Sequence, residues 1–176
     1  PPRPHAANGS CSLPWPQPVT RGNSGTNETG RAEKPSKIKM KNFHPGGKLG
    51  AGLVLVQDVM HFGEALPLAP VGTCMDEALI VMTEKGFGCL GIQTPDDKLT
   101  GIISDGDLRR HMSAELLAQN VEDIMTSTPV TISPDLVSGE ALQIMNDRNI
   151  QCLFVCENDT PIGLVRILDL LKIGVA

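Results

Sequence analysis

Tyrosine is absent from the 176 residues, and only 3% of them are aromatic. A core must therefore be built mainly from Leu, Ile, Val and Met side chains. No apolar run approaches the roughly 20 residues that cross a bilayer, and the first residues lack the charged-then-apolar pattern of a signal peptide. With 40% hydrophobic and 20% charged residues, the composition is typical of a soluble globular protein. We expect a cytoplasmic location.

The five cysteines are odd in number and follow no zinc-ligand spacing. Cys152 and Cys156 lie in the run CLFVC, where strand alternation places both on one face. We interpret them as small buried apolar side chains, with a metal or redox pair as the alternative. The histidines form no ligand-spaced cluster, so we expect no metal and no resident cofactor.

Residues 1–43 differ from the rest in composition and in charge. Pro, Gly, Ser, Asn and Thr dominate them, and they carry a net charge of +5, whereas residues 44–176 carry −10. Such a segment buries too little apolar surface to offset its ordering entropy, which predicts a disordered leader. A basic tail can touch nucleic acid, but a solvated leader is the favoured interpretation, and no nucleic-acid or membrane partner is expected.

The remainder of the chain repeats itself at intervals of 62 to 65 residues. The matching segments are Asp58-Val59-Met60 with Asp123-Ile124-Met125, Glu77-Ala78-Leu79 with Glu140-Ala141-Leu142, Met82 with Met145, Gly101-Ile102-Ile103 with Gly163-Leu164-Val165, and Asp107-Leu108 with Asp169-Leu170. Each unit is predicted as strand, helix, strand, strand, helix, which gives an α/β (α+β) fold. A unit of about 55 residues is marginal alone, so we expect two β-α-β-β-α units packed sheet against sheet as a pseudo-twofold pair.

The predicted organisation is a leader at 1–43, a linker at 44–55, a first unit at 56–115 and a second unit at 116–176. Thr73 and Asp76 have the spacing of a capping box for the first helix, and Asp135 is the substitute expected in the second unit. The last helix of each unit is predicted to begin near Asp105 and Ile167.

These motifs resemble the tandem CBS domains named after cystathionine β-synthase, over about residues 56–176. Three stretches are similar to the C-terminal half of the arabinose-5-phosphate isomerases: His44-Pro45-Gly46-Gly47-Lys48-Leu49-Gly50, Val59-Met60-His61, and Ser104-Asp105-Gly106-Asp107-Leu108-Arg109-Arg110. The resemblance implies a cytoplasmic sugar-phosphate pathway that leads to 3-deoxy-D-manno-octulosonate (Kdo) and lipopolysaccharide.

In that family the isomerase domain precedes the CBS pair and needs well over a hundred residues. Only 43 residues precede His44, so we expect no isomerase activity from this chain alone and no catalytic residue. The histidine of the His-Pro-Gly-Gly stretch resembles an active-site residue of the family. A proton-shuttling histidine needs a partner carboxylate and a bound substrate, so His44 is interpreted as a vestige.

The resemblance also implies a ligand site, because CBS pairs bind nucleotides with a hydroxyl residue followed three positions later by Asp. Ser104 and Asp107 fit this motif, and Arg166 with Asp169 is the equivalent in the second unit. A carboxylate accepts hydrogen bonds from ribose hydroxyls, and a guanidinium binds anions. The predicted ligand-binding residues are Ser104, Asp105, Asp107, Arg109, Arg110, Arg166 and Asp169.

We therefore expect a regulatory module that binds a nucleotide or sugar nucleotide, such as the cytidine monophosphate conjugate of Kdo. Two alternatives stay open: a fragment of a complete arabinose-5-phosphate isomerase, and a structural dimerisation unit with empty clefts. A homodimer is expected through the last helix of each unit, whose apolar residues exceed what one small core needs. Those residues are Leu108, Met112, Leu168, Leu170 and Leu171.

Overall fold

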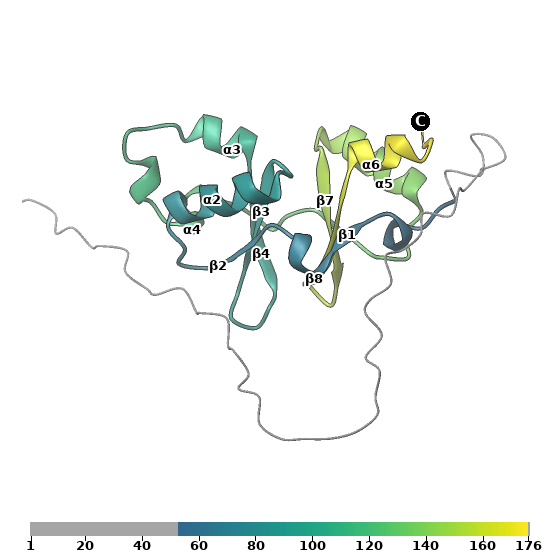
Figure 1. The fold of residues 1–176 in the computed structure, drawn as a ribbon, viewed down its shortest axis with the longest axis horizontal. Helices are drawn as coiled ribbons and strands as arrows, with labels where there is room; N and C mark the ends of the chain where they lie inside the picture. The colour runs from purple at the N-terminus through teal and green to yellow at the C-terminus, as the bar shows by residue number, and fades with distance from the viewer. Residues whose placement is uncertain (1–52, 176) are drawn as a thin grey trace, which may run out of the picture. The chain divides into compact units, whose positions relative to one another are not determined.

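The computed structural model describes residues 53–175, which form two four-stranded sheets with helices on their outer sides (Figure 1). The first sheet has the order β2-β3-β4-β5, and the second has the order β1-β8-β7-β6. The strands are β1 (His61–Phe62), β2 (Leu68–Pro70), β3 (Cys89–Gln93), β4 (Leu99–Ser104), β5 (Thr126–Ser127), β6 (Thr131–Ile132), β7 (Cys152–Glu157) and β8 (Thr160–Arg166). The predicted leader, His44 and most of the linker lie outside the described residues.

The two long helices are α2 (Met75–Lys85) and α5 (Ser138–Arg148), and each turns one stripe toward its own sheet. In α2 the buried residues are Met75, Ala78 and Met82, which recur at helical spacing. The shorter helices are α3 (Asp105–Arg110), α4 (Val121–Ile124) and α6 (Ile167–Lys172), and single 3₁₀ turns are η1 (Val56–Asp58), η2 (Gly63–Ala65) and η3 (Leu116–Ala118). The predicted element order and the starts of α3 and α6 are confirmed.

The predicted cap of the first helix is wrong. The N-cap of α2 is Cys74, and the Thr73 hydroxyl instead donates to the carbonyl of Pro70 at 2.7 Å. The backbone N–H of Met75 is taken by the carbonyl of Gln119, so tertiary contact replaces a side-chain cap. The N-cap of α5 is Val137 rather than Asp135, again without a side-chain cap.

Each unit lends a short strand to the sheet of the other unit, which the sequence did not predict. Strand β1 belongs to the first unit but pairs antiparallel with β8 of the second, and β5 belongs to the second unit but pairs antiparallel with β4 of the first. Two repeated glycines make room for this exchange. A Cβ at Gly101 would clash with the side chain of Met125, and a Cβ at Gly163 would clash with that of Met60. The methionine of each repeated Asp-x-Met motif therefore packs against the repeated glycine of the other unit.

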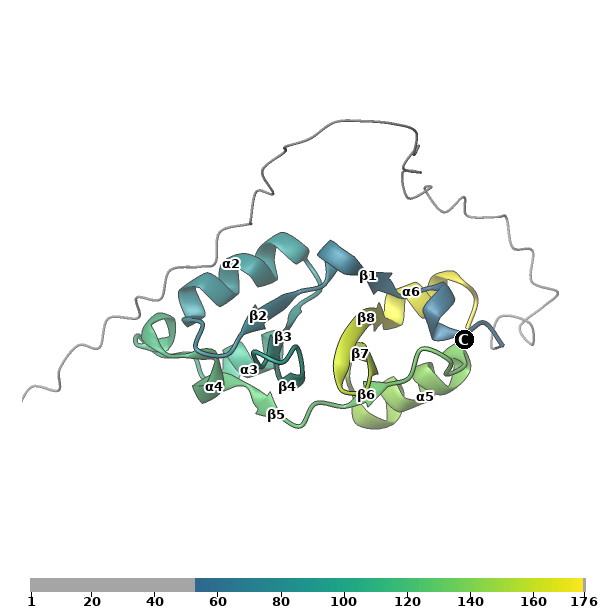
Figure 2. The same ribbon diagram turned by 90° about the horizontal axis from the view of Figure 1, so that it is seen from below.

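The inner faces of the two sheets share an apolar core, as predicted. Its buried members are Leu66, Cys89, Phe154 and Leu164, and they come from both units. Figure 2 shows the strands β3 and β4 facing β7 and β8, with the helices outside. Gly91 supports this packing, because a Cβ there would lie 2.7 Å from the Phe154 ring.

The segment before β1 is bonded to the second unit. The N–H of Val56 donates to the carbonyl of Leu136, and the N–H of Ser138 donates to the carbonyl of Val54 at 2.7 Å. The boundary placed at 115/116 stays a prediction. Within residues 53–175, none of the helices has the length and apolarity needed to cross a membrane.

Substituting Gly91 with Ala tests the sheet-to-sheet packing. The added methyl must push against Phe154, so Gly91→Ala is expected to destabilise the fold by about 1–3 kcal/mol and to lower Tm by several degrees. Gly106→Ala is the matched control, because a Cβ at Gly106 would meet nothing closer than 3.4 Å and alanine favours a helix. Thermal melts followed by circular dichroism decide the matter, and equal Tm values for the two variants would contradict the packing.

Candidate functional site

A buried carboxylate lies where β4 runs into α3. Ser104 is the N-cap of α3, and its backbone N–H and hydroxyl donate to Oδ2 of Asp107 at 2.8 and 2.5 Å. In return, the N–H of Asp107 donates to the Ser104 hydroxyl at 3.3 Å. This reciprocal capping box fixes the carboxylate at the first turn of the helix.

The second carboxylate oxygen faces a cation and another hydroxyl. Arg110 forms an ion pair with Oδ1 of Asp107, and the hydroxyl of Thr126 donates to the same oxygen at 3.3 Å. Burial alone raises the pKa of Asp107, but the Ser104 hydrogen bonds and the Arg110 charge outweigh it and hold the pKa below its ordinary value. The group is therefore an ionised acceptor at neutral pH.

An equivalent carboxylate lies where β8 runs into α6. The Arg166 guanidinium donates two hydrogen bonds to the Asp169 carboxylate, from Nε to Oδ2 at 3.0 Å and from Nη2 to Oδ1 at 3.1 Å. His61 Nε2 lies 3.0 Å from Oδ2, and Lys172 Nζ lies 3.9 Å from Oδ1. Burial raises the pKa of Asp169, yet the bonds from Arg166 and His61 prevail and lower it overall.

An aromatic ring completes this second cluster. The guanidinium carbon of Arg166 lies 5.0 Å from the centroid of the Phe87 ring, a cation–π distance. The His61 ring meets the same Phe87 edge to face at 4.9 Å. Arg166 is therefore held by a carboxylate and an aromatic ring together, and its side chain keeps only 27% exposure.

The exchanged strands supply one partner to each carboxylate. Thr126 is on β5 and His61 is on β1, and both follow the methionine of the repeated Asp-x-Met motif. Each carboxylate is thus contacted by the other unit's strand. Neither residue was predicted as part of the site, although their shared place after the repeated methionine was a signal that could have found them.

The structure brings together five of the seven predicted residues. Ser104, Asp107 and Arg110 form one cluster, and Arg166 and Asp169 form the other. Asp105 and Arg109 are exposed beside the first cluster, and Arg109 makes no ion pair with any described residue. Phe87 and Lys172 are further contacts that the sequence did not indicate.

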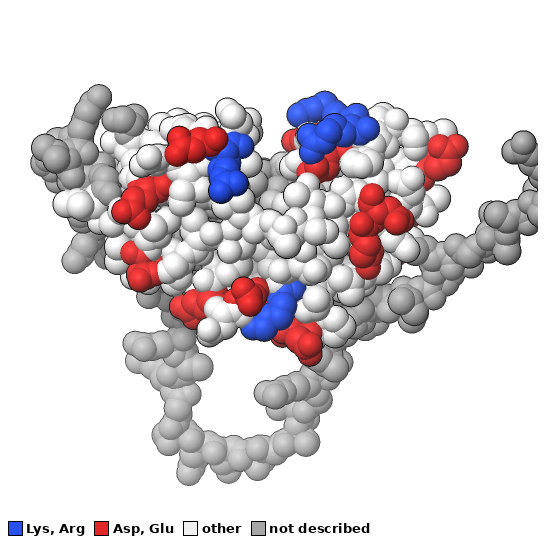
Figure 3. Space-filling model, turned by 180° about the vertical axis from the view of Figure 1, so that it is seen from behind, with Lys and Arg blue, Asp and Glu red and all other residues white. Residues whose placement is uncertain are grey.

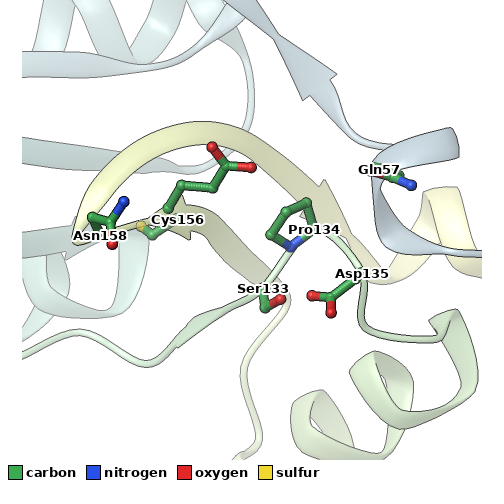
Figure 4. Close-up of a pocket in the computed structure, with 7 residues that line it drawn as sticks. Gln57, Ser133, Pro134, Asp135, Cys156 and Asn158 are labelled. Atoms are coloured by element: carbon green, nitrogen blue, oxygen red, sulfur yellow. The ribbon is translucent and has the colours of Figure 1, made fainter.

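Two surface hollows are lined by none of the residues of the two clusters. The larger, of about 550 Å³, is at the turn between β7 and β8, at the opposite end of β8 from Arg166 (Figure 4). Its lining residues are Gln57, Ser133, Pro134, Asp135, Cys156, Glu157 and Asn158. With two carboxylates and no Lys or Arg, it suits an anionic ligand poorly. The other, of about 230 Å³, includes Ile167 but neither motif carboxylate.

Basic side chains are scarce on the described surface. Figure 3 shows a face with few groups of Lys and Arg among more numerous Asp and Glu. An acidic surface repels anions at long range, so the arginines beside the two carboxylates are the local exceptions. Residues 53–175 contain no cluster of three or more His, Cys, Asp or Glu side chains that could hold a metal ion.

Comparison with known proteins gives the family. The CBS domain model matches residues 121–176. Over 136 residues the chain is 42% identical to the arabinose 5-phosphate isomerase KdsD of Pseudomonas aeruginosa, covering 75% of this chain and 42% of that protein. The chain spans less than half the length of the curated relatives it matches.

Solved structures agree on the fold. The CBS domain pair of protein MJ0100, in complex with 5′-methylthioadenosine and S-adenosyl-L-methionine, superposes with a TM-score of 0.62 at 22% identity, covering 68% of this chain and 94% of that one. CBSX2 in complex with AMP gives 0.59 at 22% identity, with coverage of 67% and 93%. The chain therefore carries a CBS domain at residues 121–176, has the fold of a CBS domain pair, and is similar in sequence to a part of the arabinose 5-phosphate isomerases.

Proposed function

We propose that this CBS pair is a regulatory module that binds the ribose and phosphate of a nucleotide at the Ser104–Asp107 cluster. The observation that carries the proposal is the buried, ionised Asp107 carboxylate, held at a helix start by Ser104 and faced by one basic side chain. Such a carboxylate accepts hydrogen bonds from ribose hydroxyls, and Arg110 pairs with a phosphate.

The two clusters differ in how easily a ligand can enter. The Arg110 side chain is 65% exposed and makes an ion pair with Asp107 alone, so moving it into water costs little. It is then free to bind the ligand phosphate. Arg166 is held by a two-pronged contact to Asp169 and by the Phe87 ring. A ligand at Asp169 must break more contacts, so we propose that the Ser104–Asp107 cluster binds first and more tightly.

The comparisons support a nucleotide as the ligand class. The structures of MJ0100 and CBSX2 contain 5′-methylthioadenosine with S-adenosyl-L-methionine, and AMP, respectively. The similarity to KdsD supports arabinose-5-phosphate isomerase as the regulated activity. The chain itself is proposed to be non-catalytic, because it matches less than half of the length of KdsD and has the fold of CBS pairs solved with nucleotide-type ligands.

The finer proposal names the cytidine monophosphate conjugate of Kdo as a ligand preferred over ATP. Feedback by a late product needs a site away from the substrate, and an acidic sugar offers a carboxylate to Arg109 or Arg110. ATP brings more negative charge to residues 44–176, whose net charge is −10, and binds less well without a metal. The adenosine ligands of the related folds make AMP the main competitor.

The alternative of a structural unit with empty clefts makes a different prediction, because it requires no ligand at all. Nucleotide binding separates the two. Under the other alternative, a fragment of a complete isomerase, the same two clusters would act within a longer protein.

Replacing Asp107 with Asn tests the site. Asp107→Asn keeps the shape of the side chain but loses the charged acceptor, so affinity for AMP or for the cytidine sugar nucleotide is expected to fall about 5- to 150-fold. Asp147→Asn is the matched control, because Asp147 is exposed on α5. Isothermal titration calorimetry on variants with unchanged circular dichroism gives the answer.

Equal affinity of wild type and Asp107→Asn would contradict the site. The same calorimetry ranks the ligands: the account expects the cytidine sugar nucleotide to bind more tightly than metal-free ATP. If only adenosine nucleotides bind, the site stands and the sugar-nucleotide proposal fails.

We also propose a homodimer formed through α3 and α6, which Figure 1 draws along the same edge of the described chain. Three of the five apolar residues predicted for this contact are exposed: Met112 by 69%, Leu168 by 57% and Leu171 by 44%. Met112 was expected on the helix but lies beyond the end of α3 at Arg110. The other two serve the chain's own core, since Leu170 is fully buried and Leu108 packs against the first unit's core. The proposed dimer contact therefore involves Met112, Leu168 and Leu171 rather than all five predicted residues.

Charges placed on this face should prevent association. Leu168→Asp combined with Leu171→Asp is expected to convert a dimer, with twice the chain mass of 18.8 kDa, into a monomer. Ile80→Asp is the control, because Ile80 is similarly exposed, by 60%, but lies on a different helix, α2. Light scattering coupled to size exclusion measures the mass, and a wild-type monomer at micromolar concentration would contradict the dimer.

A further inference from the structure

Cys89 and Cys152 occupy the same place in the two repeats. Cys89 is the first residue of β3 and Cys152 is the first residue of β7, the equivalent inner strands of the two sheets. The two cysteines lie 63 residues apart, which is the offset between the repeated helices. Both belong to the apolar core between the sheets. Cys89 is fully buried and Cys152 is half-buried.

The two thiols are in contact with each other. Each is the other's side-chain hydrogen-bond partner, although they come from different units. Two residues that are equivalent under a pseudo-twofold axis touch only where that axis passes between them. The crossing of β3 and β7 therefore holds the two sulfur atoms side by side.

The charges around the pair make Cys152 the more acidic thiol. Arg166 is the direct strand neighbour of Cys152 in the β7–β8 ladder. The hydrogen bond from Cys89 and the Arg166 charge lower the pKa of Cys152, against burial and the charge of Asp105. The hydrogen bond and burial raise the pKa of Cys89. A thiolate at Cys152 beside a protonated thiol at Cys89 is the arrangement of an attacking and a resolving cysteine.

We propose that Cys89 and Cys152 are an oxidation site that closes to a disulfide between the two CBS units. The co-reactant is a hydroperoxide. The Cys152 thiolate attacks the peroxide, an S–O bond forms, the O–O bond breaks, and water or an alcohol leaves. The sulfur of Cys89 then attacks the sulfenic acid, the S–S bond forms, and the oxygen leaves as water. Two thiols lose two electrons and two protons, and the hydroperoxide takes them up.

Cys156 cannot close a disulfide with Cys152. It lies four residues from Cys152 on the same strand, a spacing of about 13 Å that no disulfide can span. Burial, together with the charge of Asp159, raises its pKa to about 11, which keeps it a thiol at neutral pH.

Mass spectrometry of the full chain tests the proposal. Protein is treated with hydrogen peroxide, its remaining thiols are alkylated, and it is digested with trypsin. The expected product is a cross-link between peptides 86–98 and 149–166 that dithiothreitol releases. Because peptide 149–166 contains Cys152 and Cys156, the variants assign the bond: Cys156→Ser keeps the cross-link, whereas Cys152→Ser and Cys89→Ser lose it.

A second readout follows the folded state. The bond closes a loop of more than 60 residues, so the oxidised chain is expected to melt roughly 5 °C or more above the reduced chain, a gain that Cys89→Ser does not show. Two results would overturn the proposal: Cys89 recovered as an alkylated thiol after oxidation, or a cross-link that persists in Cys152→Ser. The proposal does not rest on nucleotide binding, which can be assayed separately for oxidised and reduced protein.

Discussion

The exchange of β1 and β5 between the two units is the contact on which the rest of the structure depends. Each strand has only two residues, yet each closes the edge of the other unit's sheet. The methionine before each exchanged strand lies against a glycine of the strand it pairs with: Met60 against Gly163 of β8, and Met125 against Gly101 of β4. Larger side chains at those glycines would clash with these methionine side chains. Each sheet has its fourth strand only when both units are present. This explains physically why a unit of about 55 residues is found as a pair.

The same exchange builds the candidate sites. Asp107 receives a hydroxyl from Thr126 and Asp169 receives the His61 ring, so each carboxylate is set by one unit and contacted by a strand of the other. The clusters have nevertheless diverged. Replacing the hydroxyl residue of the motif with Arg166 gives a carboxylate that is occupied by the chain's own guanidinium. A pseudo-symmetric fold thus presents one carboxylate with an exposed counter-ion and one that is internally paired.

Much of this could be predicted from residues alone, because repeats and periodicity are local signals. The offsets of 62 to 65 residues gave the two units, and the helix stripe gave α2 and α5. Ser104 and Asp107 were expected at this helix start as ligand-binding residues, and the structure shows that they also form a capping box there. What failed depends on contacts distant in sequence. The cap expected at Thr73 lost to a carbonyl of Gln119, and two-residue strands such as β1 have no period to detect. The role of Phe87 in the second cluster could not be predicted either, because its partners His61 and Arg166 are distant from it in the sequence.

The central claim is that a nucleotide site is assembled from both units. An amide NMR titration of the ¹⁵N-labelled chain with AMP tests it directly. The account predicts that residues 104–107 and residues 125–127 shift together, with one dissociation constant, because Asp107 and Thr126 share a hydrogen bond. Shifts confined to the hollow around residues 133–135 and 156–158, or the absence of any shift at 125–127, would contradict it.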